Sequence, residues 1–105
     1  MLTIENNTFS EQQIIKLRGE LSGINALQFR DKASTIVKIK QGELHLDISQ
    51  ISKMDLTGFN SVVMLKKETG RKNISFLLIA DTDNPIHEFI HLSKLPFHCV
   101  SSSSN

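Results

Sequence analysis

Hydrophobic positions alternate with polar ones in the first half of the chain. Leu2 and Ile4 have polar neighbours, and residues 14–17 form a second apolar run that ends at Gly19. Polar residues typical of turns separate the two runs, so we predict an opening antiparallel pair of strands. Alternation returns at residues 44–48, where the period of two predicts a further strand.

Helical spacing follows in two segments. Apolar residues recur at intervals of three and four from Ala26 to Val37, which predicts one helix that ends before Gly42. A second stripe of the same kind begins at Phe59 and ends near Gly70. Both helices are expected to bury one face.

The rest of the chain completes an alternation of strands and helices. Residues 49–53 read as a polar loop, and residues 74–80 form the most apolar run. We predict that this run is the central strand, because a strand buried on both faces loses its alternation. Residues 86–90 predict a third, short helix, residues 97–100 an edge strand, and residues 101–105 a disordered polar tail.

The predicted order is β-β-α-β-α-β-α-β. Strands that alternate with helices indicate an α/β fold, here a mostly parallel mixed β-sheet with helices packed against it. No linker divides the chain, so we predict one domain over residues 1–100.

Composition restricts the classes of function. The chain has 105 residues, of which 39% are hydrophobic and 22% charged, as in one globular domain. Its formal net charge is +1, so we expect no nucleic-acid partner, which would need a clustered basic face. No apolar run approaches the roughly 20 residues of a membrane-spanning helix, so we expect no direct membrane insertion. The start lacks a secretory signal, and the single cysteine, Cys99, cannot form an internal disulfide, so the expected location is the cytoplasm.

One segment resembles a catalytic signature. Residues 87–91 match the H-E-x-x-H motif, in which two histidines on a helix hold zinc and the glutamate activates water. The longer motif would place glycine and histidine where this chain has Lys94 and Phe97. We therefore expect neither a metal site nor a catalytic residue. Glycine-rich phosphate loops do not occur in the sequence, and we expect no cofactor.

The remaining candidate is a hydroxyl at the start of the second helix, in the run Asp55-Leu56-Thr57-Gly58. The plain interpretation is that Asp55 or Thr57 caps the free N–H groups of the first turn. The functional interpretation is a phosphorylation site. A phosphate on Thr57 would meet those N–H groups and the positive end of the helix dipole. Serines 49, 52 and 61 flank the site and offer other positions for a phosphate.

Two segments resemble the STAS domain family of sulphate transporters and anti-sigma factor antagonists. Residues 17–21 (Leu-Arg-Gly-Glu-Leu) are similar to the family's L-x-G-E-L. Residues 46–48 (Leu-Asp-Ile), followed by residues 54–59 (Met-Asp-Leu-Thr-Gly-Phe), are similar to its L-D-[LF]-x(n)-[IM]-D-[ST]-[ST]-G-[LF]. The order and spacing of these segments fit the family to about residue 100, and the resemblance implies a STAS-type α/β fold.

In that family, the hydroxyl residue before the motif glycine is phosphorylated, and it corresponds to Thr57. The resemblance implies a non-enzymatic anti-sigma factor antagonist. The dephosphorylated form would bind an anti-sigma factor that is a serine-protein kinase of GHKL type, phosphorylation would break the complex, and a PP2C-type phosphatase would restore it. The expected partner-binding residues are Ser22, Asp55, Leu56, Thr57, Gly58, Phe59, Asn60 and Ser61.

Three positions depart from the family pattern. Leu56 replaces the first hydroxyl, Ser22 stands where members often have aspartate, and Asn60 replaces a common glycine. The resemblance also leaves two other functions open. One is an accessory subunit bound to the ATPase of a phospholipid-transporting ABC system, with Thr57 as a docking contact. The other is a stressosome-type scaffold.

Overall fold

A computed structural model describes residues 1–102 of the chain. Over this range it forms five strands and four helices, one helix more than predicted. No helix in this range has the length and apolarity needed to cross a membrane. The elements are β1 Leu2–Phe9, β2 Gln12–Leu21, α1 Gly23–Asp31, α2 Ala33–Ile36, β3 Glu43–Met54, α3 Leu56–Arg71, β4 Ser75–Ile79, α4 Ile86–Ser93 and β5 Cys99–Val100.

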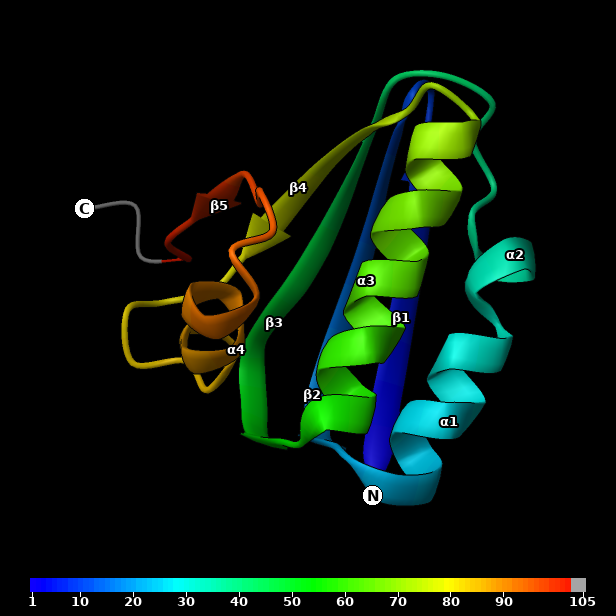
Figure 1. Cartoon of the computed structure of the whole chain (residues 1–105). Coiled ribbons are helices and arrows are strands. Elements are labelled where there is room, and N and C mark those ends of the chain that lie inside the picture. The colour runs from blue at the N-terminus through cyan, green and yellow to red at the C-terminus, as the bar shows by residue number, and fades with distance from the viewer. Residues whose placement is uncertain (103–105) are drawn as a thin grey trace.

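The strands form one sheet in the order β1-β2-β3-β4-β5. β1 is antiparallel to β2, and every other pair of neighbours is parallel. The predicted α/β fold with a mostly parallel mixed sheet is therefore confirmed. Helices α1, α2 and α3 lie on one side of the sheet, and α3 runs along its middle (Figure 1).

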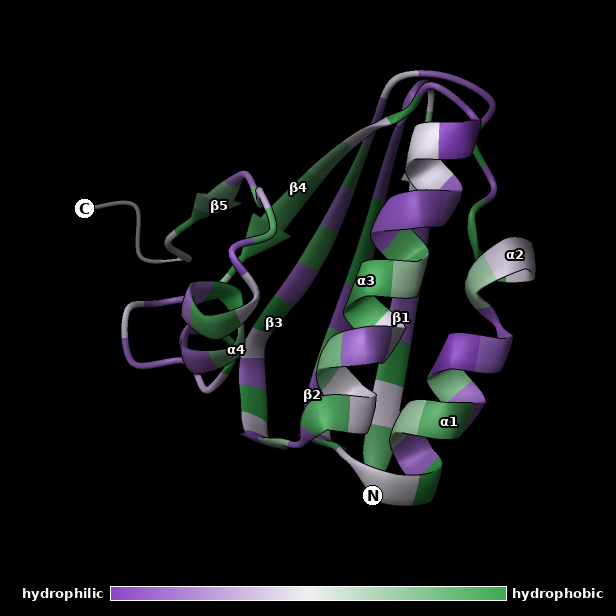
Figure 2. Cartoon of the chain, in the orientation of Figure 1, coloured by the Kyte–Doolittle hydropathy of each residue, from purple (hydrophilic) through white to green (hydrophobic). Residues whose placement is uncertain are grey.

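The core lies between this side of the sheet and the helices. Leu44, Leu46 and Ile48 of β3 are fully buried, whereas His45 and Asp47 between them are half-buried on the opposite side. Figure 2 shows this alternation as green and purple bands along β3. The sheet therefore has one side that is packed against helices and one open side.

The prediction of a single helix over residues 26–37 is wrong. α1 ends at Asp31, Lys32 interrupts the helical pattern with ψ at −3°, and α2 ends at Ile36. Gly42 therefore does not terminate a helix, because α2 ends six residues earlier and Val37 is already extended.

A buried side chain of β2 explains the early end of α2. The amide nitrogen of Gln13 donates to the carbonyl oxygen of Ile36 at 2.7 Å and to Oδ1 of Asn6 at 2.8 Å. Its amide oxygen accepts from the backbone N–H of Lys38 at 2.8 Å. Gln13 thus satisfies backbone groups that a longer helix would otherwise have paired.

The prediction of a loop at residues 49–53 is also wrong. β3 continues to Met54 because β2 continues to Leu21, and the two strands stay paired to that point. The consequence for the site is that Asp55 follows directly after a strand.

Residues 74–80 do not form the central strand, since β3 is the middle strand of the sheet. β4 is apolar on both sides because Leu77 and Ile79 are half-buried on the open side of the sheet. The edge strand expected at residues 97–100 is confirmed, although it is only two residues long.

Part of the tail predicted to be disordered is held in place. Ser101 Oγ and Ser102 N donate to Oδ1 of Asp81 at 2.7 and 3.0 Å. Residues 103–105, the rest of the predicted tail, lie outside the described residues.

Candidate functional site

Asp55 holds two helix N-termini with one carboxylate. Its Oδ1 accepts a hydrogen bond from the N–H of Gly58 at 2.8 Å, which caps α3. Its Oδ2 accepts from the N–H of Gly23, the first residue of α1, at 3.0 Å. Ser22, which precedes α1, makes no capping bond with its own side chain. Asp55 therefore supplies the side-chain hydrogen bond that Ser22 does not, and it joins α1 to α3.

These contacts lower the pKa of Asp55. The N–H of Gly23 contributes most and the N–H of Gly58 next, and together they outweigh desolvation, which acts in the opposite direction. Asp55 is therefore a carboxylate at neutral pH, and the site carries a negative charge two residues from Thr57.

Thr57 is the second residue of α3, and its side chain is half-buried. Its hydroxyl bonds to no other group among residues 1–102, so Asp55 is the cap and Thr57 is not. The N–H of Gly58 is taken by the Asp55 carboxylate, and that of Phe59 by the Asp55 carbonyl at 3.0 Å. The N–H groups of Leu56 and Thr57 have no hydrogen-bond partner in the described chain. A free hydroxyl thus lies beside two unused donors at the positive end of a helix.

Gly58 allows α3 to begin in contact with β2. A Cβ atom at this position would lie 1.9 Å from the carbonyl oxygen of Leu21 and 3.1 Å from Cγ of Met54. No larger residue fits without a shift of the backbone. The contact and the Asp55 bonds together fix the first turn of α3 against β2 and α1.

The predicted partner-binding residues are only partly accessible. Leu56 is 63% exposed and Asn60 is also exposed, whereas Asp55, Thr57 and Ser22 are half-buried. Three residues of the predicted set, Gly58, Phe59 and Ser61, are buried and cannot contact a partner directly. Phe59 is 4% exposed, and Ser61 Oγ donates to the carbonyl oxygen of Gly58 at 2.6 Å, so both side chains support α3 from the core side.

Two exposed apolar residues of α1 escaped the sequence analysis. Ile24 is 70% exposed and Leu27 is 39% exposed. α1 lies beside α3 (Figure 1), and the bond between Gly23 and Asp55 brings their first turns together. We call Ile24, Leu27 and Leu56, which are exposed apolar residues at the starts of α1 and α3, the apolar rim. The sequence did contain a signal for them, because a large apolar residue outside the buried stripe of a helix often marks an interaction surface.

The hydroxyls of the flanking serines make hydrogen bonds, unlike that of Thr57. Ser49 Oγ donates to Oδ1 of Asp47 at 2.6 Å, and Ser52 Oγ donates to the carbonyl oxygen of Gly19 at 3.2 Å.

The H-E-x-x-H residues lie on α4, which packs against the first turn of α3 through the stacked rings of Phe89 and Phe59 (Figure 1). A ring nitrogen of His87 lies 2.8 Å from the carbonyl oxygen of Asp81, and His91 is exposed. In the described chain, no three His, Cys, Asp or Glu side chains are grouped to hold a metal.

Comparisons with known proteins agree with this fold. The model of the STAS domain family matches residues 3–100. No curated protein sequence matches the chain significantly.

Among solved structures, the anti-sigma factor antagonist SpoIIAA in its unphosphorylated form is similar, with a TM-score of 0.75 and 18% identity over 97% of this chain and 90% of that one. The phosphorylated form of the Bacillus cell fate determinant SpoIIAA has a TM-score of 0.72 and 20% identity over 97% and 93%. An anti-sigma factor antagonist from Mycobacterium paratuberculosis has a TM-score of 0.71 and 16% identity over 93% and 86%. At these identities the similarity establishes the fold alone. The family match covers nearly the whole chain and confirms the resemblance seen in its motifs, so this chain belongs to the STAS domain family.

Proposed function

We propose that this chain is a non-enzymatic anti-sigma factor antagonist that phosphorylation of Thr57 switches off. The observation that carries the proposal is the unbonded hydroxyl of Thr57, next to the Asp55 cap and two unused N–H groups. A hydroxyl with a purely structural capping role would be bonded to the helix. Two of the similar solved structures are anti-sigma factor antagonists in name, and a third is a phosphorylated SpoIIAA, which supports the same function.

The unphosphorylated form has a surface suited to a protein partner. Leu56 and Ile24 of the apolar rim are 63% and 70% exposed. Complete burial of such a side chain contributes about 1.5–3 kcal/mol. An anti-sigma factor with a GHKL-type kinase domain is the proposed partner, and it would supply the ATP.

Phosphorylation would change the charge of this surface without disturbing the fold. A phosphate carries about −1.5 to −2 charges at neutral pH, and it would join the carboxylate of Asp55. The N–H groups of Leu56 and Thr57 can stabilise it within the chain. A partner that covers the apolar rim would have to bury these charges, which is costly unless the partner pairs them. The complex would therefore dissociate while the domain stays folded.

A paired pull-down from the native host's lysate tests the proposal, with wild type and Thr57→Asp as baits. We expect wild type to retain a GHKL-type kinase and Thr57→Asp to bind it at least about tenfold more weakly. The free energy of unfolding of Thr57→Asp should stay within about 0.5 kcal/mol of wild type. Thr82→Asp, which puts the same charge on an exposed turn, should bind like wild type.

Mass spectrometry identifies the residue that the captured kinase phosphorylates. With ATP, the captured kinase should place a phosphate on Thr57 of wild type and none on Thr57→Ala. Unfolding of Thr57→Asp, or equal capture of the kinase by both baits, would contradict the switch. Capture of an ABC ATPase would indicate the transporter accessory subunit instead.

A further inference from the structure

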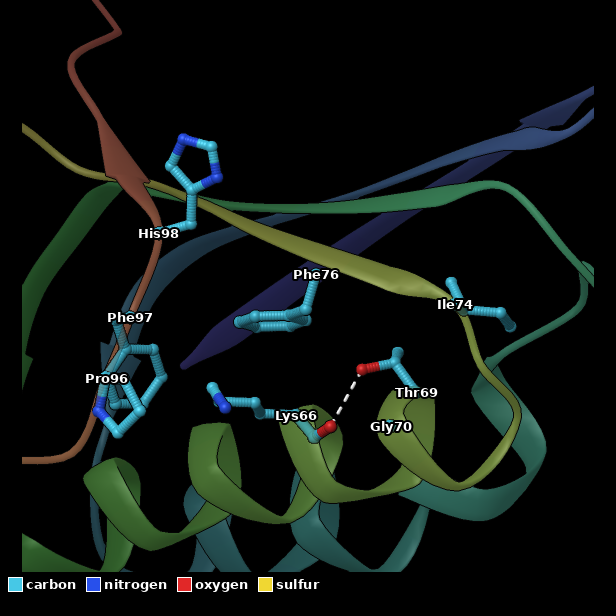
Figure 3. Close-up of a pocket in the computed structure, with 8 residues that line it drawn as sticks. All are labelled: Lys66, Thr69, Gly70, Ile74, Phe76, Pro96, Phe97 and His98. Atoms are coloured by element: carbon cyan, nitrogen blue, oxygen red, sulfur yellow. Dashed lines mark hydrogen bonds between the residues drawn. The ribbon is translucent and has the colours of Figure 1, made fainter.

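A cavity of about 610 Å³ lies at the other end of α3, between its second half, the start of β4 and the segment before β5 (Figure 3). It exists because β5 pairs only with Leu78 and Ile79, which leaves the first residues of β4 without a neighbouring strand on that side. The volume falls within the range of small-molecule sites, about 300–1,000 Å³.

The wall of this cavity is aromatic and preformed. Phe76 faces the helices from β4 but is only half-buried, whereas Leu44 and Leu78 on the same side of the sheet are fully buried. Phe97 meets Phe76 edge to face, with ring centroids 6.4 Å apart, and it also contacts Phe59 of the core at 6.0 Å. The two rings are therefore held in place without a ligand, and part of their apolar surface remains uncovered.

One positive charge stands above this wall. Lys66 Nζ lies 5.8 Å from the centroid of the Phe97 ring, and no carboxylate in the described chain pairs with it. The neighbouring cations Arg71 and Lys72 both pair with Glu68. Among residues 1–102, no Asp or Glu lines the cavity.

Figure 3 shows how these side chains are directed. Phe76, Phe97 and Lys66 turn toward the same space, while His98 points to the other side of β4. The cavity thus combines an apolar wall with the single ammonium of Lys66.

We propose that this cavity binds a small amphiphilic carboxylate, with its aryl or alkyl body against Phe76 and Phe97 and its carboxylate beside the Lys66 ammonium. A cationic ligand would find no acidic partner. A phosphate ester carries about two negative charges, and the Lys66 ammonium could neutralise only one of them. A carboxylate carries one negative charge, which the ammonium can neutralise completely. The site does not depend on Thr57, which lies in the first turn of α3.

The test is a titration of the ¹⁵N-labelled full chain with 4-phenylbutyrate and with octanoate, followed by NMR. We expect saturable shifts centred on Lys66, Phe76 and Phe97. Lys66→Met keeps the aliphatic stem and should weaken binding about tenfold. Lys67→Met, an exposed neighbour outside the cavity, should change it less than about twofold. The cation 4-phenylbutylamine should bind at least about tenfold more weakly than 4-phenylbutyrate.

Lys66 makes no ion pair with the described residues, so its variant should keep the fold, which the amide spectrum in the same measurement checks. The proposal is overturned if Lys66→Met binds as tightly as wild type, if the amine binds as well as the acid, or if the shifts centre elsewhere. It is equally overturned if neither carboxylate gives a saturable shift at concentrations on the order of 10 mM.

Discussion

The two ends of α3 are held in different ways. At the first turn, Asp55 bonds α3 to α1, and Gly58 lies against the backbone of β2. At the last turn, a Cβ atom at Gly70 would have no neighbour within 4 Å, and the cavity beside Lys66 is open. One end of α3 is thus fixed by contacts to α1 and β2, where the proposed switch lies, and the other end has open space beside it.

The largest expected effect comes from the aromatic contact beneath the rigid end. Phe59 is 4% exposed and stacks on Phe89 with ring centroids 5.5 Å apart. Phe59→Ala should lower the free energy of unfolding by about 3–4 kcal/mol, because it leaves a cavity under α3 and α4. Leu56→Ala, at an exposed position three residues earlier, should lower it by less than about 0.5 kcal/mol. Urea denaturation measures both, and similar losses would show that the first turn is not supported from the core.

The two glycines of α3 allow the comparison to be tested with one substitution. Gly58→Ala should cost about 2–3 kcal/mol, because the added methyl group meets the carbonyl oxygen of Leu21. Gly70→Ala should raise the free energy of unfolding by up to about 0.5–1 kcal/mol, since it restricts the unfolded chain and meets no atom. Thermal unfolding of the two variants should therefore shift in opposite directions. A stable Gly58→Ala would mean that α3 can move away from β2.

The bridge made by Asp55 should have a smaller effect. Asp55→Ala removes the cap of α3 and the bond to Gly23, and we expect a loss of about 1–2 kcal/mol near pH 7. Asp31→Ala is the matched control, because Asp31 is exposed and lies 3.6 Å from Arg30 in a surface pair. Its effect should stay below about 0.5 kcal/mol.

The same variant predicts a dependence on pH. The pKa of Asp55 is lowered in the folded state from its ordinary value of 3.8. The stabilisation that the Asp55 carboxylate gives the folded state is therefore complete above pH 3.8 and is lost as the pH falls through the lowered pKa. The difference in unfolding free energy between wild type and Asp55→Ala should shrink toward about pH 2. A constant difference across this range would show that the carboxylate charge is not responsible.

Periodicity predicted the order of the elements, apart from the helix that the structure divides into α1 and α2, but it did not predict where the elements end. A repeat of two or of 3.6 residues is a local property, and every predicted strand and helix has a counterpart. The end of α2 depends on Gln13, which lies 23 residues before Ile36 in the chain. The length of β3 depends on its pairing with β2. Contacts between segments that are distant in sequence do not appear as a repeat within either segment, so periodicity cannot predict where these elements end.

The same division applies to the candidate site. The position of Thr57 in the first turn of a helix follows from local sequence. The role of Asp55 in joining α1 to α3 depends on Gly23, a contact across 32 positions of the chain. The burial of Phe59 could have been inferred from helical spacing, because it lies three residues before the buried Val62. Ser61 is only two residues from Phe59, and helical spacing does not place these two side chains on one side of α3.

Gln13 also determines which alignment of the strands is possible. A shift of β2 by one residue would turn Gln13 to the open side of the sheet and Ile14 toward the helices. The carbonyl oxygen of Ile36 and the N–H of Lys38 would then face a hydrocarbon side chain and lose their partners, at a cost of about 1–3 kcal/mol each. The apolar residues of β2 gain from burial in any strand register that turns them toward the helices. The amide favours only one alignment, and it therefore makes the native arrangement unique as well as stable.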